Sequence, residues 1–173
     1  MFYFVRHGQT DYSERGTKVF QGFGVNLAPL SAVGVRQIEE TAKDERLRGA
    51  SLILSSPYTR AVQTAAILSK ALQADIVIET DLHEWKADKT YRWPGEEAAE
   101  AAHQEYQACG GRYPDGEERP WETAAEARER VLAVLRRYAS YGDVVIACHG
   151  MMIEATTQGH HPENGEIVPF ELD

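Results

Sequence analysis

The stretch FYFVRHGQT, residues 2–10, decides the fold and raises the question of function. It begins with an apolar run that is typical of a buried strand. Arg6, His7 and Gly8 follow at once, so the strand gives way to a cation, an imidazole and a residue without a side chain. Because a buried strand does not need these residues, we interpret its end as part of a functional site.

Strand-like and helix-like segments alternate along the rest of the chain. Near-continuous apolar runs, typical of strands buried on both faces, occur in ASLILSS (50–56), DIVIET (75–80) and DVVIACHG (143–150). EIVPFELD (166–173) is expected to be an edge strand because of Pro169. Helices are expected over 31–43, from Pro57 onward, over 96–108 and after the capping-box pattern at 123–126. This order predicts a three-layer α/β/α fold around a mainly parallel sheet.

Length and composition fit one domain, residues 1–173. The chain has a mass of 19.3 kDa and is 43% hydrophobic, which is enough for a single core. No apolar run approaches the roughly 20 residues that span a bilayer. The apolar run at the start is too short for a signal-peptide core. We therefore expect a cytoplasmic protein with no membrane partner.

Charge and cysteine content narrow the possible partners. The formal net charge of −9 argues against a nucleic-acid partner, which favours a basic face. An anionic substrate stays compatible with this charge, because a few cations can be concentrated in one pocket. Cys109 and Cys148 lack the spacing of a metal site or a disulfide framework, and we expect two reduced thiols.

The carboxyl ends of the expected strands carry a set of polar residues. Ligands of parallel α/β sheets bind beyond these ends. The first strand leads to Arg6 and His7, and the second to Arg60 in the first turn of a helix. The third strand leads to Glu84 and the fourth to His149. Two arginines, two histidines and a carboxylate should therefore meet at one edge of the sheet.

This set of residues suits phosphate chemistry. Guanidinium groups donate paired hydrogen bonds to phosphate oxygens. The sequence has neither a carboxylate cluster for magnesium nor a Walker loop, so we expect no metal and no cofactor. A neutral His7 could attack phosphorus and form a phosphohistidine. Glu84 would protonate the leaving oxygen and then activate water, with Trp85 and burial as a cause for the raised pKa that this needs.

Motifs in the same order resemble those of the histidine phosphatase superfamily, the phosphoglycerate-mutase-like proteins. They are VRHGQT (5–10), QGFGVNLAPLSAVGVRQ (21–37), SSPYTRAVQTA (55–65), LHEW (82–85) and ACHGMM (147–152). The resemblance covers nearly the whole chain and implies the phosphoglycerate-mutase-like fold. It makes His7 the phosphorylated nucleophile, Arg6, Arg60 and His149 the phosphate pocket, and Glu84 the acid and base.

The resemblance also implies further substrate contacts, and at some positions this sequence differs from the family pattern. By it, Gln21 and Gly22 lie beside the phosphate, and Ser13 stands where mutases usually carry an asparagine. We expect Ser13 and Gly150 to contact the substrate. The glycine-rich stretch that often follows the acid is replaced by WKADKTYRWPGEE (85–97). The short chain also lacks the long insertions of the glycolytic mutases. It is therefore expected to be closer to the small phosphatases.

Residues 86–121 allow two interpretations. They could form a lid that selects the leaving group, with Trp85, Lys89, Tyr91 and Arg92 as contacts. They could equally be a packed excursion whose aromatic side chains fill a small second core. The sequence does not decide between these interpretations.

The sequence thus predicts a metal-independent phosphatase that hydrolyses a small phosphomonoester through a phosphohistidine on His7. One alternative is a phosphoglycerate mutase-type phosphotransferase, and another is a protein that binds a phosphorylated ligand without turnover. A homodimer through the last strand is an option that the sequence leaves open. The remaining histidines, which are His83, His103, His160 and His161, are interpreted as surface or structural residues.

Overall fold

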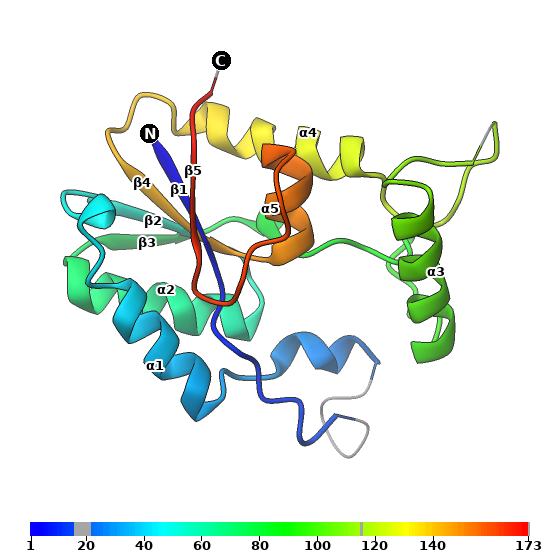
Figure 1. Cartoon of the computed structure of the whole chain (residues 1–173), viewed down its shortest axis with the longest axis horizontal. Coiled ribbons are helices and arrows are strands. Elements are labelled where there is room, and N and C mark those ends of the chain that lie inside the picture. The colour runs from blue at the N-terminus through cyan, green and yellow to red at the C-terminus, as the bar shows by residue number, and fades with distance from the viewer. Residues whose placement is uncertain (16–21, 115, 173) are drawn as a thin grey trace.

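The computed structural model describes residues 1–15, 22–114 and 116–172. Its sheet has five strands in the order β3-β2-β4-β1-β5 (Figure 1). The strands are β1 (Phe2–Arg6), β2 (Leu52–Ser55), β3 (Asp75–Ile78), β4 (Val144–Cys148) and β5 (Ile167–Phe170). All neighbours are parallel except β1 and β5, which are antiparallel. This confirms the mainly parallel α/β fold and the edge position of the last strand.

Helices cover both faces of the sheet. They are α1 (Ala32–Thr41), α2 (Thr59–Leu72), α3 (Glu96–Ala108), α4 (Ala124–Arg137) and α5 (Gly150–Thr157). Short 3-10 helices lie in the connections, at η1 (Gly22–Leu27), η2 (Glu45–Leu47) and η3 (Thr80–Leu82). Figure 1 shows α1 and α2 on one side of the sheet, α4 and α5 on the other, and α3 away from the sheet.

The two faces follow from alternation along the strands. Ile146 in β4 packs with Val131 of α4 in one buried cluster. Its neighbour Val145 packs with Leu68 of α2 in the other cluster. Successive side chains of a strand point to opposite faces, so a strand covered on both faces must be apolar at every position. The five residues of β4 are all buried, as this requires.

The starts of two helices can be compared with the sequence patterns that predicted them. At α4, the Thr123 hydroxyl accepts a hydrogen bond from the Glu126 backbone N–H (3.2 Å), and the Glu126 carboxylate accepts one from the Thr123 backbone N–H (2.8 Å). The predicted capping box is therefore present. Helix α2 begins at Thr59, two residues beyond Pro57, from which the sequence predicted it.

Strand β3 corrects one prediction. The sequence indicated a strand buried on both faces over 75–80, but Ile76 and Ile78 are 37% and 48% exposed. The reason is the sheet order, because β3 is an edge strand with only β2 beside it. Apolar composition alone does not distinguish this edge strand from a central one.

The register of β1 positions the site. Arg6 pairs with Cys148, so the residues that follow them, His7 and His149, leave the sheet side by side. The His7 backbone N–H also donates to the Cys148 carbonyl (2.9 Å). Within the described part of the chain, no helix combines the length and the apolar character that crossing a membrane requires.

Candidate active site

The loop after β1 is packed tightly against α1. A Cβ atom on Gly8 would lie 2.4 Å from the Gly34 carbonyl oxygen, and one on Gly34 would lie 2.2 Å from the Gln9 carbonyl oxygen. Only residues without a side chain permit this approach. The Asn164 side-chain amide holds the His7 carbonyl from the other side (2.8 Å). The backbone of the predicted nucleophile is thus fixed from two directions.

The surroundings of the His7 imidazole favour its neutral form. Its Nδ1 lies 2.8 Å from the Gly8 carbonyl oxygen, which can only accept, so Nδ1 carries the proton. Nε2 then has a lone pair and accepts a hydrogen bond from the Arg60 Nε (3.2 Å). Burial, and after it the charge of Arg60, lower the pKa of His7 to about 3. A lone pair on Nε2 is therefore present at neutral pH.

Three predicted phosphate-pocket residues surround this imidazole. Arg60 is buried in the first turn of α2, with its guanidinium 5.1 Å from the centre of the Tyr58 ring. Arg6 donates from Nη1 to the Pro162 carbonyl. The His149 ring centre is 5.2 Å from that of His7. Burial, followed by the Arg60 charge, holds the pKa of His149 well below its ordinary value.

Unpartnered polar atoms mark the same region. In the described part of the chain, the buried side-chain nitrogen and oxygen atoms without a hydrogen-bond partner are Arg6 Nε, Arg60 Nη1, His149 Nδ1 and His83 Nε2. Leaving such an atom unpaired costs about 1–3 kcal/mol. The two guanidinium nitrogens are donors with a positive charge, so an anionic oxygen ligand would satisfy them. The geometry therefore favours phosphate in this pocket.

Glu84 lies on the loop that follows η3, and Arg130 of α4 holds this loop. Arg130 donates to the carbonyl oxygens of Asp81 and Glu84. It also forms a two-pronged ion pair with the buried Glu122, with distances of 2.6 and 2.9 Å. The Glu84 carboxylate accepts a hydrogen bond from the Trp85 backbone N–H (2.8 Å). Sequence reasoning missed Arg130 and Glu122, because no local pattern links them to residues 81–84.

Two of the predicted substrate contacts after Glu84, Trp85 and Lys89, contact other residues of the same segment or of α4. Trp85 donates from Nε1 to the Glu122 carbonyl and packs on Tyr106, with ring centres 5.3 Å apart. Lys89 pairs with the carboxylates of Glu118 (3.5 Å) and Glu126 (3.0 Å). These contacts are those of a packed excursion with its own aromatic cluster.

The remaining predicted substrate contacts lie outside this packed segment or on its exposed surface. Tyr91 is exposed, with its ring centre 6.5 Å from that of His83, and Arg92 and Ser13 are also exposed. Gly150 is the first residue of α5 and Gly22 the first residue of η1. Gln21 lies outside the described residues. The structure therefore places Tyr91 against His83 and Gly150 directly after His149, and it leaves Ser13 on the surface.

Three residues that the sequence analysis did not assign to the site lie near its histidines. The Ser56 hydroxyl lies 2.7 Å from His149 Nε2. The Tyr58 ring centre is 5.2 Å from that of His149. Both stand in the quoted SSPYTRA stretch, which was a usable signal. His83, interpreted as a surface or structural residue, is 4% exposed.

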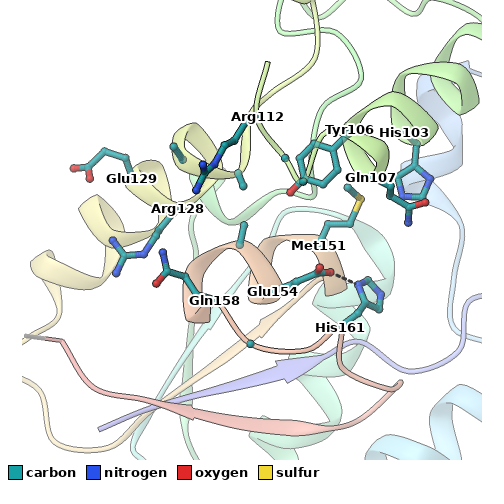
Figure 2. A pocket seen from close by; sticks show the side chains of 16 residues that line it. His103, Tyr106, Gln107, Arg112, Arg128, Glu129, Met151, Glu154, Gln158 and His161 are labelled. Atoms are coloured by element: carbon teal, nitrogen blue, oxygen red, sulfur yellow. Dashed lines mark hydrogen bonds and ion pairs between the residues drawn. The ribbon is translucent and has the colours of Figure 1, made fainter. Parts of the chain in front are cut away.

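A cavity of about 1000 Å³ lies between α3, α4 and α5 (Figure 2). No predicted catalytic residue lines it. At the end shown with Met151, His161 Nδ1 is 2.9 Å from the Glu154 carboxylate. A Cβ atom on Gly150 would lie 2.5 Å from His161 Cε1, so this histidine closes onto the first turn of α5. The cavity thus adjoins the predicted phosphate pocket without containing it.

No metal centre is arranged among the described residues. Within 1–15, 22–114 and 116–172, no three or more His, Cys, Asp or Glu side chains form a group that could hold a metal ion. Cys109 and Cys148 are free thiols. Burial raises the pKa of the Cys148 thiol well above its ordinary value, so this neighbour of His149 stays protonated. Arg6 and Arg60 supply the positive charge beside the two histidines.

Fold and site together define an α/β protein in which two buried histidines and two arginines meet at the carboxyl ends of the central strands. The sequence model of the histidine phosphatase superfamily (branch 1) matches residues 2–166. The chain therefore belongs to the histidine phosphatase superfamily.

Individual relatives agree with this assignment. The "Uncharacterized phosphatase PhoE" of Bacillus subtilis (strain 168) is 30% identical over 154 residues, which are 87% of this chain and 72% of that protein. The "Probable phosphoglycerate mutase GpmB" of Proteus mirabilis (strain HI4320) is 35% identical over 82 residues, or 47% of this chain and 36% of that protein. The match thus spans little more than a third of that relative.

Among solved structures, mycobacterial glucosyl-3-phosphoglycerate phosphatase superposes with a TM-score of 0.66. Its sequence identity is 24%, and the match covers 90% of this chain and 76% of that one. At this identity the similarity shows the fold.

Proposed function

We propose that the protein is a metal-independent phosphatase that hydrolyses a small phosphomonoester through a phosphohistidine on His7. One observation carries the proposal. A buried, neutral His7 has its Nε2 lone pair beside Arg60, and nitrogens of Arg6 and Arg60 have no partner in the described part of the chain. A neutral imidazole nitrogen beside guanidinium groups is the arrangement that phosphoryl transfer needs.

The reaction has two steps. In the first, His7 Nε2 forms a bond to phosphorus while the bond to the leaving oxygen breaks, and Glu84 donates a proton to that oxygen. In the second, Glu84 takes a proton from water, whose oxygen attacks phosphorus as the P–N bond breaks. The electron pair of that bond returns to Nε2, and phosphate departs. Arg6 and Arg60 stabilise the charge on the equatorial oxygens in both steps.

Hydrolysis of an aryl phosphate in the presence of a chelator tests the proposal. We expect the wild type to be active and His7→Ala to be inactive. Acid quenching would destroy a phosphohistidine, so the wild type is quenched in alkali and searched for phosphate bound to His7. Full activity of His7→Ala would overturn the nucleophile assignment.

Glu84→Gln tests the acid role in the same assay. We expect it to slow hydrolysis of alkyl phosphates about 10²–10⁴-fold, the usual effect of a general acid, and aryl phosphates far less. Equal losses on both classes would move this role to another carboxyl group. Phosphate transfer to a second hydroxyl, rather than to water, would favour the mutase-type activity that the Proteus relative's name suggests.

A further inference from the structure

We propose that His83, with Tyr58 and Tyr91, forms a subsite for a hydroxylated leaving group, in which His83 Nε2 accepts a hydrogen bond from a substrate hydroxyl. The subsite rests on the proposed phosphatase function. It would make the substrate a monophosphate ester of a polyol or sugar.

The proton positions on His83 follow from its neighbour. Nδ1 lies 2.7 Å from the carbonyl oxygen of Glu84, and a carbonyl oxygen only accepts, so Nδ1 carries the proton. Nε2 is then an acceptor. Burial, followed by the charge of Arg130, lowers the pKa of His83 to about 4, so the ring stays neutral at neutral pH.

The same atom lacks a partner. His83 is 4% exposed, and its Nε2 belongs to the small group of unpartnered buried side-chain atoms in the described residues. All the others belong to Arg6, Arg60 and His149. An oxygen-rich ligand would satisfy the nitrogens of Arg6 and Arg60, and we interpret His83 Nε2 as the contact for another part of that ligand. An acceptor requires an O–H or N–H donor, whereas the phosphate oxygens cannot supply one.

The position of His83 fits the leaving group. It precedes Glu84, which would protonate the leaving oxygen, and its ring centre is 6.4 Å from that of Tyr58. Tyr58 in turn contacts His149 and carries the Arg60 guanidinium over its face. One aromatic ring thus separates His83 from the phosphate pocket. A group next to the ester oxygen would lie between them.

Tyr91 provides the outer wall. Its ring stands edge-on to His83 and is 62% exposed. Its backbone has a φ of 59°, which is costly for a residue with a side chain and is concentrated at functional positions. Lys86 also contacts Tyr91: its Nζ lies 4.6 Å from the ring centre and donates a hydrogen bond to the Tyr91 hydroxyl (3.2 Å). Two tyrosine rings beside a hydrogen-bond acceptor suit the mixed C–H and O–H surface of a polyol.

A matched pair of esters tests the subsite. Glycerol 2-phosphate and isopropyl phosphate share a carbon skeleton, and only the first carries hydroxyl groups. We expect the wild type to prefer glycerol 2-phosphate in kcat/KM. Both esters are also measured as competitive inhibitors of aryl phosphate hydrolysis, so that the preference is read from binding when turnover is slow.

Two substitutions distinguish the roles of the two ring nitrogens of His83. His83→Asn keeps a donor near the position of Nδ1 but has no atom at Nε2, whereas His83→Gln reaches the position of Nε2. We expect His83→Asn to lower the preference for glycerol 2-phosphate about 5- to 100-fold, the effect of one lost buried hydrogen bond. His83→Gln should retain part of it. His160→Asn, an exposed histidine paired with Glu166, serves as the control and should leave the ratio unchanged.

The outcomes are distinguishable. A wild type that hydrolyses aryl phosphate but does not discriminate between the two esters overturns the subsite and leaves the phosphatase function intact. If His83→Asn keeps the preference and His83→Gln loses activity, His83 only holds the Glu84 loop. A wild type without activity on any ester, with no inhibition by phosphate, is a failure of the proposed function itself.

Discussion

The predicted phosphate pocket and residues 86–121 are both rich in cations and aromatic rings, yet they use them in opposite ways. In the pocket, Arg6 and Arg60 keep buried nitrogens without partners. In the segment, Lys89 pairs with Glu118 and Glu126. Arg119 likewise pairs with carboxylates, at 2.9 and 2.8 Å.

The difference separates functional from structural charge. A buried cation without a carboxylate weakens the folded state, and a ligand that supplies negative oxygens restores the balance. A cation paired on the surface stabilises the fold slightly and needs no ligand. The sequence predicted Arg60 as part of the phosphate pocket and Lys89 as a contact of a possible lid. The structure buries Arg60 without a carboxylate partner and pairs Lys89 with two carboxylates.

Among the substitutions considered, Arg60→Met should have the largest effect on activity. We expect kcat/KM for an aryl phosphate to fall about 10²–10³-fold, because one group that stabilises the transition-state charge is lost. The urea midpoint should stay the same or rise, because a buried charge without a carboxylate partner is removed. Inorganic phosphate should no longer raise the melting temperature. A large loss of stability with activity retained would give Arg60 a structural role.

The pH dependence of stability sharpens the comparison. The pKa of His7 is about 3 in the folded protein, against 6.5 as the ordinary value. Between these values the unfolded chain binds a proton that the folded protein does not, so stability is full above pH 6.5 and falls as the pH drops toward 3. At pH 5 the loss from His7 is about 2 kcal/mol.

Urea unfolding of the wild type and His7→Phe between pH 8 and pH 4.5 measures this loss. His7→Phe should show a flatter profile, because it lacks one of the groups that titrate on unfolding. His83 and His149 are also buried with lowered pKa values, so the variant keeps part of the slope. Identical slopes in the two proteins would mean that His7 is protonated in the folded state.

Lys89→Met should have the smallest effect. We expect a loss of up to about 1 kcal/mol in the free energy of unfolding, the usual range for partly exposed ion pairs. The kcat/KM for aryl and alkyl phosphates should be unchanged. A raised KM for alkyl esters alone would instead show that Lys89 leaves its carboxylates to contact the leaving group, as the lid interpretation of residues 86–121 predicts.

Short sequence patterns predicted those features, such as strand ends and helix starts, that are determined by residues close together in the chain. The RHG sequence after an apolar run indicated the end of β1, and the pattern at 123–126 gave the start of α4. The strand ends then brought His7 and His149 together by topology alone. These predictions needed only periodicity and the rule that ligands bind at the carboxyl edge of a parallel sheet.

The missed features depend on contacts between distant segments. The exposure of β3 depends on sheet order, which its own residues do not encode. The Arg130–Glu122 pair supports a loop some 40 residues earlier in the chain. The burial of His83 depends on packing against Tyr58, which lies 25 residues earlier in the chain. None of these relations has a short-range pattern.

The pairing of β1 has a consequence for the order of folding. Phe2 pairs with Val144 on one side and with Phe170 on the other, so the strand that is synthesised early is paired late. Contacts of such high sequence separation form slowly, because a long loop must close first. Residues 52–78, where β2, α2 and β3 are neighbours in sequence, can assemble beforehand. Arg60 would then be in place before the pairing of β1 brings Arg6 and His7 to it.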